Sequence, residues 1–312
     1  MTRVLIALGG NALTSPDGQV RPEDQIGAVA LAAERIAEVA ASGAQILLTH
    51  GNGPQVGNLL VKNELAAHVV PPVPLDWCGA QTQGTVGFIL TNALERAMAA
   101  RGLAVPVAVV VTRTLVDAAD PGFANPTKPI GRYLPAAEAK LMIEHGQHWR
   151  DMGARGWRRV VASPEPLDVL DAPAVLALLD AGYAVVAAGG GGIPVVRGED
   201  GSLHGVEAVI DKDLATAVLG RVAGAGRLVI ATDVDAAWLG WGTAQARPLG
   251  AISVGELRRL AAQGHFGSGS MGPKVEAACR FIENGGELAA IAALDRIADA
   301  AQGRAGTVVT PD

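Results

Sequence analysis

The sequence predicts an α/β fold built from parallel β-α-β units. Short runs of aliphatic and β-branched residues alternate with longer segments in which apolar residues recur at helical spacing. Glycines cluster directly after several of these runs, where a strand would turn into a helix. Of the 312 residues, 40 are glycine and 49% are hydrophobic. This composition is typical of a globular protein and excludes a disordered or collagen-like chain.

Five runs are expected to form buried strands, over residues 4–8, 45–49, 107–111, 184–188 and 228–232. Between the first two, apolar residues from Ile26 to Ala40 recur at helical spacing, with Pro22 near the start and Gly43 just after the end. This is one strand-helix-strand crossover. Further helices are expected near residues 81–100, 174–181, 212–219, 254–262 and 273–283.

One compositional break lies at about residues 112–160, called the flap below. Several prolines interrupt regular structure there, and Trp149 and Trp157 accumulate. We therefore expect a single domain over residues 1–312 with the flap inserted in it. Residues 128–159 contain seven basic and three acidic residues, whereas the whole chain has a net charge of −6. Such a flap would attract a small anion, although a solvated surface insertion would look the same.

The charge balance and the cysteines exclude several protein classes. A net charge of −6 argues against a general nucleic-acid or anionic-membrane binder. Cys78 and Cys279 lack a metal-binding spacing and are expected to be reduced, buried thiols. The first apolar run is too short for a signal peptide, and no stretch reaches the roughly 18 apolar residues of a membrane helix. We expect a soluble, cytoplasmic protein.

Three glycine-rich loops follow predicted strands. Gly9, Gly10 and Asn11 follow the first, Gly51, Asn52 and Gly53 the second, and residues 189–192 the fourth. In a parallel sheet these loops share the carboxyl edge, where ligands bind. Their backbone N–H groups suit the binding of phosphate or carboxylate. A single such loop could also contain glycine only because a tight turn requires it. Neither a P-loop nor a dinucleotide-binding motif is present.

Three lysines stand in glycine- or proline-framed settings. Lys128 lies between two prolines, Lys212 between Asp211 and Asp213, and Lys274 directly after Gly272 and Pro273. Phosphoryl transfer depends on positioning and on neutralising the charge of the moving group. These lysines therefore indicate a kinase-type site.

Together these motifs resemble the carbamate kinases of the amino acid kinase family. The resemblance spans essentially the whole chain in order, and the segments that carry it are residues 7–13, 49–57, 125–131, 158–164, 207–213 and 264–276. It implies an αβα sandwich around a mostly parallel sheet, with a small protruding subdomain that matches the flap, and a homodimer. It also implies reversible transfer between MgATP plus carbamate and MgADP plus carbamoyl phosphate, used to make ATP in arginine or related nitrogen catabolism.

The resemblance also implies roles for individual residues, but it assigns no magnesium ligands. Lys128, Lys212, Lys274 and Asp211 would be catalytic. The substrate and the transferring phosphoryl group would contact Gly9, Gly10, Asn11, Gly51, Asn52 and Gly53. The nucleotide would be bordered by Asp213, Asp233, Val234, Asp235, Trp238, Gly269 and Met271.

Three positions depart from the family pattern. Ala162 stands where proline is usual, Arg132 follows Gly131 where proline is common, and Trp238 replaces a tyrosine. They affect the nucleotide rim and the flap hinge and leave the proposed lysines intact. Two alternatives remain open: another carboxylate kinase of the same family, and a non-catalytic sensor of small anions.

Overall fold

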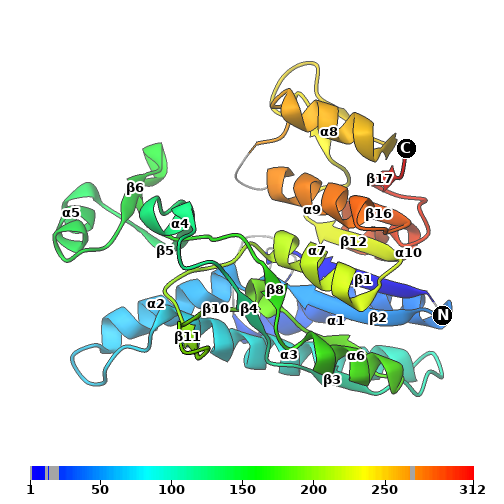
Figure 1. The fold of residues 1–312 in the computed structure, drawn as a ribbon, viewed down its shortest axis with the longest axis horizontal. Coiled ribbons are helices and arrows are strands. Elements are labelled where there is room, and N and C mark those ends of the chain that lie inside the picture. The colour runs from blue at the N-terminus through cyan, green and yellow to red at the C-terminus, as the bar shows by residue number, and fades with distance from the viewer. Residues whose placement is uncertain (1, 11–12, 14–20, 268–270) are drawn as a thin grey trace.

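An eight-stranded sheet runs through the centre of the molecule, between two layers of helices (Figure 1). The computed structural model describes residues 2–10, 13, 21–267 and 271–312; Asn11 and Gly269 lie outside the described residues. In spatial order the strands are β15 (Ala251–Ser253), β17 (Thr307–Thr310), β16 (Leu288–Ala293), β12 (Arg227–Thr232), β1 (Arg3–Leu8), β2 (Gln45–His50), β9 (Ala184–Val186) and β3 (Val107–Val109).

The sheet is mostly parallel, as the sequence predicts. Only the β16–β17 pair is antiparallel; β1 pairs in parallel with β12 on one side and with β2 on the other. All five expected strands belong to this sheet. Those expected over 107–111 and 184–188 end two residues early, because the chain turns there. Ala188 has a φ of 48°, and the 3-10 helix η3 (Gly189–Gly191) follows at once.

One face of the sheet is covered by α1 (Pro22–Ala41), α3 (Leu75–Ala99) and α10 (Ile297–Ala300). The apolar stripe expected on the first crossover helix is buried, with Val29, Ala33 and Ile36 packed in one cluster with Ile6 and Leu48 of the sheet. Helix α3 begins six residues before the expected start. Its first N–H, at Leu75, donates to the Glu207 carboxylate, which extends the helix beyond the apolar pattern.

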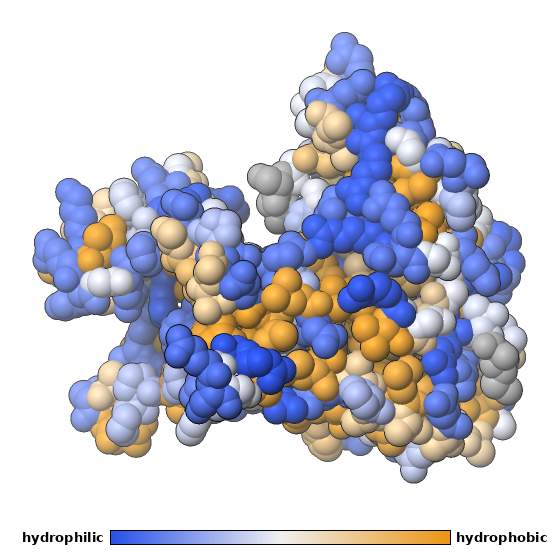
Figure 2. Space-filling view, viewed as in Figure 1, coloured by the Kyte–Doolittle hydropathy of each residue, from blue (hydrophilic) through white to orange (hydrophobic). Residues whose placement is uncertain are grey.

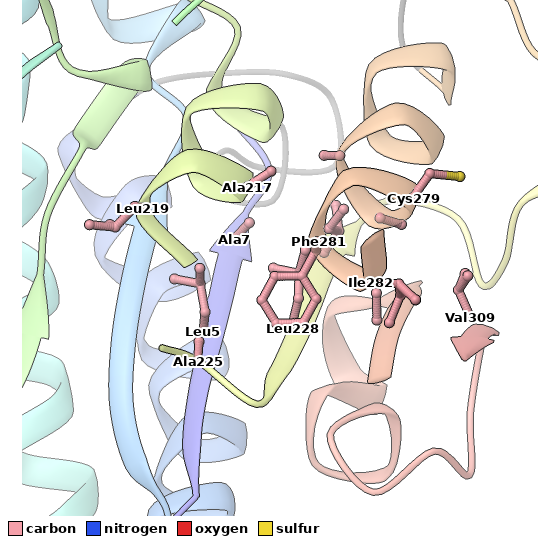
Figure 3. Packing of buried hydrophobic residues seen from close by; sticks show 14 of the residues in the cluster. Leu5, Ala7, Ala217, Leu219, Ala225, Leu228, Cys279, Phe281, Ile282 and Val309 are labelled. Carbon is pink, nitrogen blue, oxygen red and sulfur yellow. The ribbon is translucent and has the colours of Figure 1, made fainter. Parts of the chain in front are cut away.

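The other face is covered by α6 (Ala172–Asp180), α7 (Lys212–Ala223), α8 (Val254–Ala262) and α9 (Met271–Glu283). Figure 3 shows Ala217 of α7 and Phe281 of α9 packed around Leu5 of β1 and Leu228 of β12. Burial of this apolar cluster is the main force that fixes α7 and α9 on the sheet. It also fixes their first turns, which carry Lys212 and Lys274.

Smaller elements complete the body. Helix α2 (Gly53–Ala66) follows β2 and has no counterpart among the expected elements. A second sheet contains β11 (Leu203–Gly205), β10 (Ile193–Arg197), β4 (Arg113–Leu115) and β8 (Asp168–Val169). Outside these sheets lie α4 (Pro121–Ala124), the hairpin of β13 (Trp238–Leu239) and β14 (Arg247–Pro248), and the 3-10 helices η2 (Gly153–Arg155) and η4 (Leu294–Arg296).

The flap sheet, an antiparallel group of three strands, projects from the body at the left of Figure 1. It contains β5 (Lys128–Leu134), β7 (Trp157–Val161) and β6 (Trp149–Asp151), with α5 (Ala136–Glu144) packed on it. Leu134, Ala139 and Trp149 form a small core of their own. Because residues 113–115 pair with the second sheet, we propose that the projecting unit is residues 128–161, a narrower range than 112–160.

The structure bears on two expectations from the sequence, the state of the cysteines and the presence of a membrane-spanning helix. Cys78 and Cys279 are free thiols and are both buried, as expected. Within the described part of the chain, none of the helices has the length and apolar character needed to cross a bilayer.

Candidate active site

A cavity of about 210 Å³ lies where the loops after β1, β2 and β9 meet the first turns of α7 and α9. Figure 2 shows this face of the molecule hollowed between the flap sheet and helices α8 and α9. Its lining contains most of the residues expected to be catalytic or to hold the substrate and phosphoryl group: Gly10, Gly51, Asn52, Gly53, Lys128, Asp211, Lys212 and Lys274. Asp213, which was expected to border the nucleotide, also lines this cavity. Pro54, Gly190, Val209 and Ile210 complete it. We call it the phosphoryl cavity.

One buried carboxylate holds two of the three lysines. Asp213, which is 3% exposed, accepts from Lys212 Nζ on one oxygen at 2.6 Å and from Lys274 Nζ on the other at 3.0 Å. Burial opposes the negative charge of Asp213, but the two ammonium groups outweigh it and lower the pKa to about 2. Burial lowers the pKa of Lys212, against the attraction of Asp213. The three groups form a fixed, charged unit.

Lys128 reaches the same cavity from the flap sheet. Its Nζ donates to Asp211 Oδ2 at 2.7 Å, across 83 positions of sequence. The other oxygen of Asp211 accepts from the N–H of Asp213 at 2.9 Å, so that Asp211 caps helix α7. Asp211 therefore joins the flap sheet to the helix that carries Lys212.

The glycine loops approach one another closely at the cavity floor. A Cβ on Gly51 would lie 2.6 Å from the backbone nitrogen of Gly10, which only glycine avoids. The N–H groups of Gly9 and Gly51 donate to the carbonyls of Ala231 and Leu8, and so both are committed to the sheet. Gly9 does not line the cavity. The amides of Gly10, Asn52 and Gly53, which have no acceptor among the described residues, are the ones that suit an anion.

A layer of buried polar side chains behind these loops has no motif in the sequence. Thr82 Oγ1 accepts from Asn52 Nδ2 at 2.8 Å. The side-chain amide of its neighbour Gln83 makes two hydrogen bonds to the backbone of Thr112. It donates to the Thr112 carbonyl at 3.1 Å and accepts from the Thr112 N–H at 2.8 Å. Thr112 Oγ1 in turn accepts from the N–H of Ala188, the residue with the left-handed backbone. Helix α3 thus supports both the Asn52 loop and the 189–192 loop.

His50 is the last residue of β2, directly before the Gly51 loop, where it could contact phosphate or support the turn. The ring is buried, its Nδ1 lies 3.0 Å from the Gly51 carbonyl, and it does not line the phosphoryl cavity. Burial lowers the pKa of His50 to about 4, so the ring is neutral near pH 7. The geometry favours support of the turn.

A second cavity, of about 310 Å³, lies beside the first, and we call it the base cavity. It is lined by Thr232, Asp233, Val234, Trp238, Trp241, His265, Phe266, Gly267 and Met271. Four of the residues expected to border the nucleotide are therefore in one place. Asp235 is exposed and does not line this cavity, but its carboxylate accepts from Trp238 Nε1 at 3.2 Å. Met271 and Lys274 are one turn apart on α9, which connects the two cavities.

The three positions that depart from the family pattern each have a structural contact. Arg132 pairs with Glu64 of α2 at 3.1 Å, between the flap sheet and the body. Ala162 forms a β-bridge with Ala208, the residue directly before Val209, which lines the phosphoryl cavity. Trp238 stands edge to face with Trp241. All three departures are accommodated without displacing a cavity lysine.

Comparisons with known proteins agree with this geometry. The sequence model described as "Amino acid kinase family" matches residues 2–293. A carbamate kinase of Thermococcus kodakarensis is 45% identical over 99% of each chain, and one of Pyrococcus furiosus is 45% identical over the same share. The solved structure of a Giardia lamblia carbamate kinase bound to AMP-PNP superposes with a TM-score of 0.93 at 39% identity, covering 100% of this chain and 99% of that one.

Proposed function

The chain belongs to the amino acid kinase family, and from that premise we propose that it catalyses the carbamate kinase reaction. It transfers a phosphoryl group reversibly between ATP and carbamate, giving ADP and carbamoyl phosphate. The observation that carries this proposal is the phosphoryl cavity, where one buried aspartate holds two lysines beside glycine loops and a third lysine arrives from the flap sheet.

The reaction needs no proton transfer. A carboxylate oxygen of carbamate forms a bond to the γ-phosphorus of ATP, and the bond from that phosphorus to the β,γ-bridging oxygen breaks. The bonding electron pair leaves with ADP, so atoms and charge balance as written. The protein's task is to align two anions and to neutralise the charge between them.

We assign that neutralisation to the lysines. Lys212 would contact the transferring group, Lys274 the β- and γ-phosphates, and Lys128 the substrate from the flap sheet. Asp213 holds Lys212 and Lys274 a fixed distance apart, and Asp211 orients Lys128. Because the charges are in place before the substrate arrives, little reorganisation is needed at the transition state.

The backbone amides of Gly10, Asn52 and Gly53 are assigned to the oxygens of carbamate and of the moving phosphoryl group. Asn52 and Gly53 open helix α2, where the N–H groups are unpaired and the helix dipole favours an anion. Carbamate is favoured over a longer carboxylate acceptor by the 45% identity to carbamate kinases over 99% of the chain. The proposed lysine positions also go beyond what a sensor of anions requires.

Magnesium is the metal expected with the nucleotide, and the residues present fit a magnesium ion that is bound mainly through water. The hard oxygens of Asp211 and Asp213 face the cavity, but each already accepts a protein donor. Among the residues that the structure describes, no three His, Cys, Asp or Glu side chains form a metal-binding group. We therefore propose that nucleotide phosphates and water supply most of its ligands, with the aspartates in contact through water. When bound, the ion neutralises charge on the phosphates.

One assay tests the function directly. ATP formation from carbamoyl phosphate and ADP is followed with a coupled enzyme, beside reverse-direction assays with acetylglutamate and aspartate as acceptors. We expect ATP to form from carbamoyl phosphate and ADP, and no ATP to be consumed with acetylglutamate or aspartate. Activity with a longer carboxylate would indicate the other family reaction, and no transfer with any substrate would leave the sensor. The expected homodimer stays a prediction that light scattering in solution tests.

A further inference from the structure

We propose that Trp241 is the stacking platform for the nucleobase and that the base cavity therefore accepts other purine nucleoside diphosphates besides ADP. This inference rests on the proposed function, because it takes the base cavity as the end of the nucleotide site away from the phosphates. It concerns a residue that no sequence motif indicates.

The exposure of Trp241 is the first observation. Trp241 is 67% exposed, although tryptophan has the largest aromatic side chain and this one lines a cavity. A single exposed tryptophan is ordinary, as Trp77 on α3 shows at 60% exposure, but Trp241 differs in lining a cavity. A flat aromatic ligand in the cavity would cover it, and a base offers a π-face of suitable size.

The loop around Trp241 is built to present the ring. Gly240 and Gly242 on either side have φ values of 62° and 80°, in the region that favours glycine. Thr243 closes the turn, since its N–H and its hydroxyl both donate to the Gly240 carbonyl, at 3.0 and 2.7 Å. The turn connects β13 and β14, and it holds Trp241 at the mouth of the base cavity.

The two tryptophans form adjoining walls. The centroids of the Trp238 and Trp241 rings are 5.8 Å apart and the ring planes meet at 74°. A planar base that lies flat on one ring therefore presents its edge to the other, which is a favourable arrangement for aromatic groups. A bicyclic purine would contact both rings, whereas a pyrimidine has a smaller face for stacking.

The described side chains around the cavity offer little to distinguish one purine from another. The Trp238 N–H is donated to Asp235, and the Thr232 hydroxyl is donated to Asp233 at 3.0 Å. Neither is left as a donor for the edge of a base. Asp233 and His265 also line the cavity, but both are exposed, so water competes for any hydrogen bond that they make to the base. Val234, Phe266 and Met271 supply apolar surface. Since the exocyclic groups of adenine and guanine differ only in hydrogen bonding, selection by stacking admits both.

The first experiment replaces the platform and follows ATP formation from carbamoyl phosphate. Trp241→Ala should raise the KM for ADP at least about tenfold, the usual contribution of stacking one base. The KM for carbamoyl phosphate and kcat should stay within about threefold, because the phosphoryl cavity is untouched. Trp241→Phe should recover most of the loss. Trp77→Ala is the matched control: Trp77 is 60% exposed on α3, outside both cavities, and its loss should leave every constant unchanged.

The second experiment varies the base. GDP and IDP should be used with kcat/KM within about tenfold of that for ADP, and CDP and UDP should be used at least about tenfold less well than GDP. An unchanged KM for ADP in Trp241→Ala, or rejection of GDP and IDP by an enzyme that uses ADP, would overturn the inference.

A fluorescence titration separates this inference from the proposed function. ADP should quench tryptophan emission in the wild-type chain and in Trp77→Ala, but much less in Trp241→Ala. This binding signal does not depend on turnover. Quenching that needs Trp241 in a protein without carbamoyl phosphate activity would contradict the proposed reaction alone, and activity with quenching unchanged in Trp241→Ala would contradict the platform alone.

Discussion

The phosphoryl cavity and the base cavity lie side by side but are built in opposite ways. The first is a set of paired charges, drawn from β5, α7 and α9, in which each lysine already has an aspartate partner. The second is a set of aromatic and apolar side chains, with Trp238 and Trp241 on one local hairpin and the outer ring exposed. If the proposed function holds, we expect the chemical step to depend on contacts between distant parts of the chain, and nucleotide affinity to depend on a local turn.

The largest expected effect breaks the charged unit. Lys212→Ala and Lys274→Ala should each lower kcat by at least about two decades while the protein stays folded, because a unit charge pair at about 4 Å contributes roughly 4 kcal/mol at an effective dielectric near 20. Turnover and the circular dichroism spectrum are the measurements. Lys140→Ala is the control, since Lys140 is exposed on α5. Near-normal turnover in either cavity variant would remove the basis of the comparison.

The next largest effect concerns the buried support layer. Gln83→Met keeps the length of the side chain but removes both hydrogen bonds to Thr112, and each buried group left without a partner costs about 1–3 kcal/mol. We expect a lower melting temperature and kcat reduced about tenfold, with the KM for ADP nearly unchanged. Gln81→Met, two positions earlier on the exposed side of the same helix, should be neutral. A rise confined to the KM for ADP would mean that Gln83 supports the base cavity and not the phosphoryl cavity.

A pH profile sharpens the comparison, since only the phosphoryl cavity holds a buried lysine with a lowered pKa. Lys212 must be protonated to attract the phosphoryl group, so kcat/KM should fall as the pH rises through a value below the ordinary 10.5. Lys212→Arg should move this alkaline limb upward, because the guanidinium stays charged. Asp213, with a pKa of about 2, should add no acid limb above about pH 4. An alkaline limb that is the same in both proteins would exclude Lys212 as its source.

The smallest effect concerns the attachment of the flap sheet. Arg132 and Glu64 form an ion pair with both side chains more than two-fifths exposed, and such pairs contribute about 0.2–1 kcal/mol. Arg132→Ala should therefore change the KM for carbamoyl phosphate by no more than about fivefold. A double-mutant cycle with Glu64→Ala measures the coupling, which should shrink at high salt. A larger loss would mean that the hinge itself, and not only Lys128, controls the phosphoryl cavity.

Sequence alone predicted the phosphoryl cavity better than its surroundings. The glycine loops and framed lysines are local patterns, and the rule that parallel strands share a carboxyl edge brings them together. Thr82 and Gln83 were missed because, within a long apolar helix, a buried polar side chain looks the same as an exposed one. Their function depends on Asn52 and Thr112, which lie about thirty positions away in either direction.

Other omissions have similar physical causes. Strand β16 has the sequence Leu-Ala-Ala-Ile-Ala-Ala, which suits a buried helix as well as a strand, and only its pairing with β12 and β17 decides. Helix α2 begins inside a glycine loop, so its first turn was assigned to the loop alone. Trp241, a single aromatic residue between two glycines, is indistinguishable in sequence from an ordinary surface turn.

The pairing of every cavity lysine with an aspartate also bears on the release of product. Asp211 and Asp213 pair with the same ammonium groups that we propose for the phosphates. An ammonium group has three N–H donors, so a phosphate can bind beside the aspartate, but the carboxylate cancels part of the lysine charge that attracts it. Ground-state affinity is thereby lowered without loss of the charges that act on the transition state. We therefore expect the aspartates to favour turnover over retention of product.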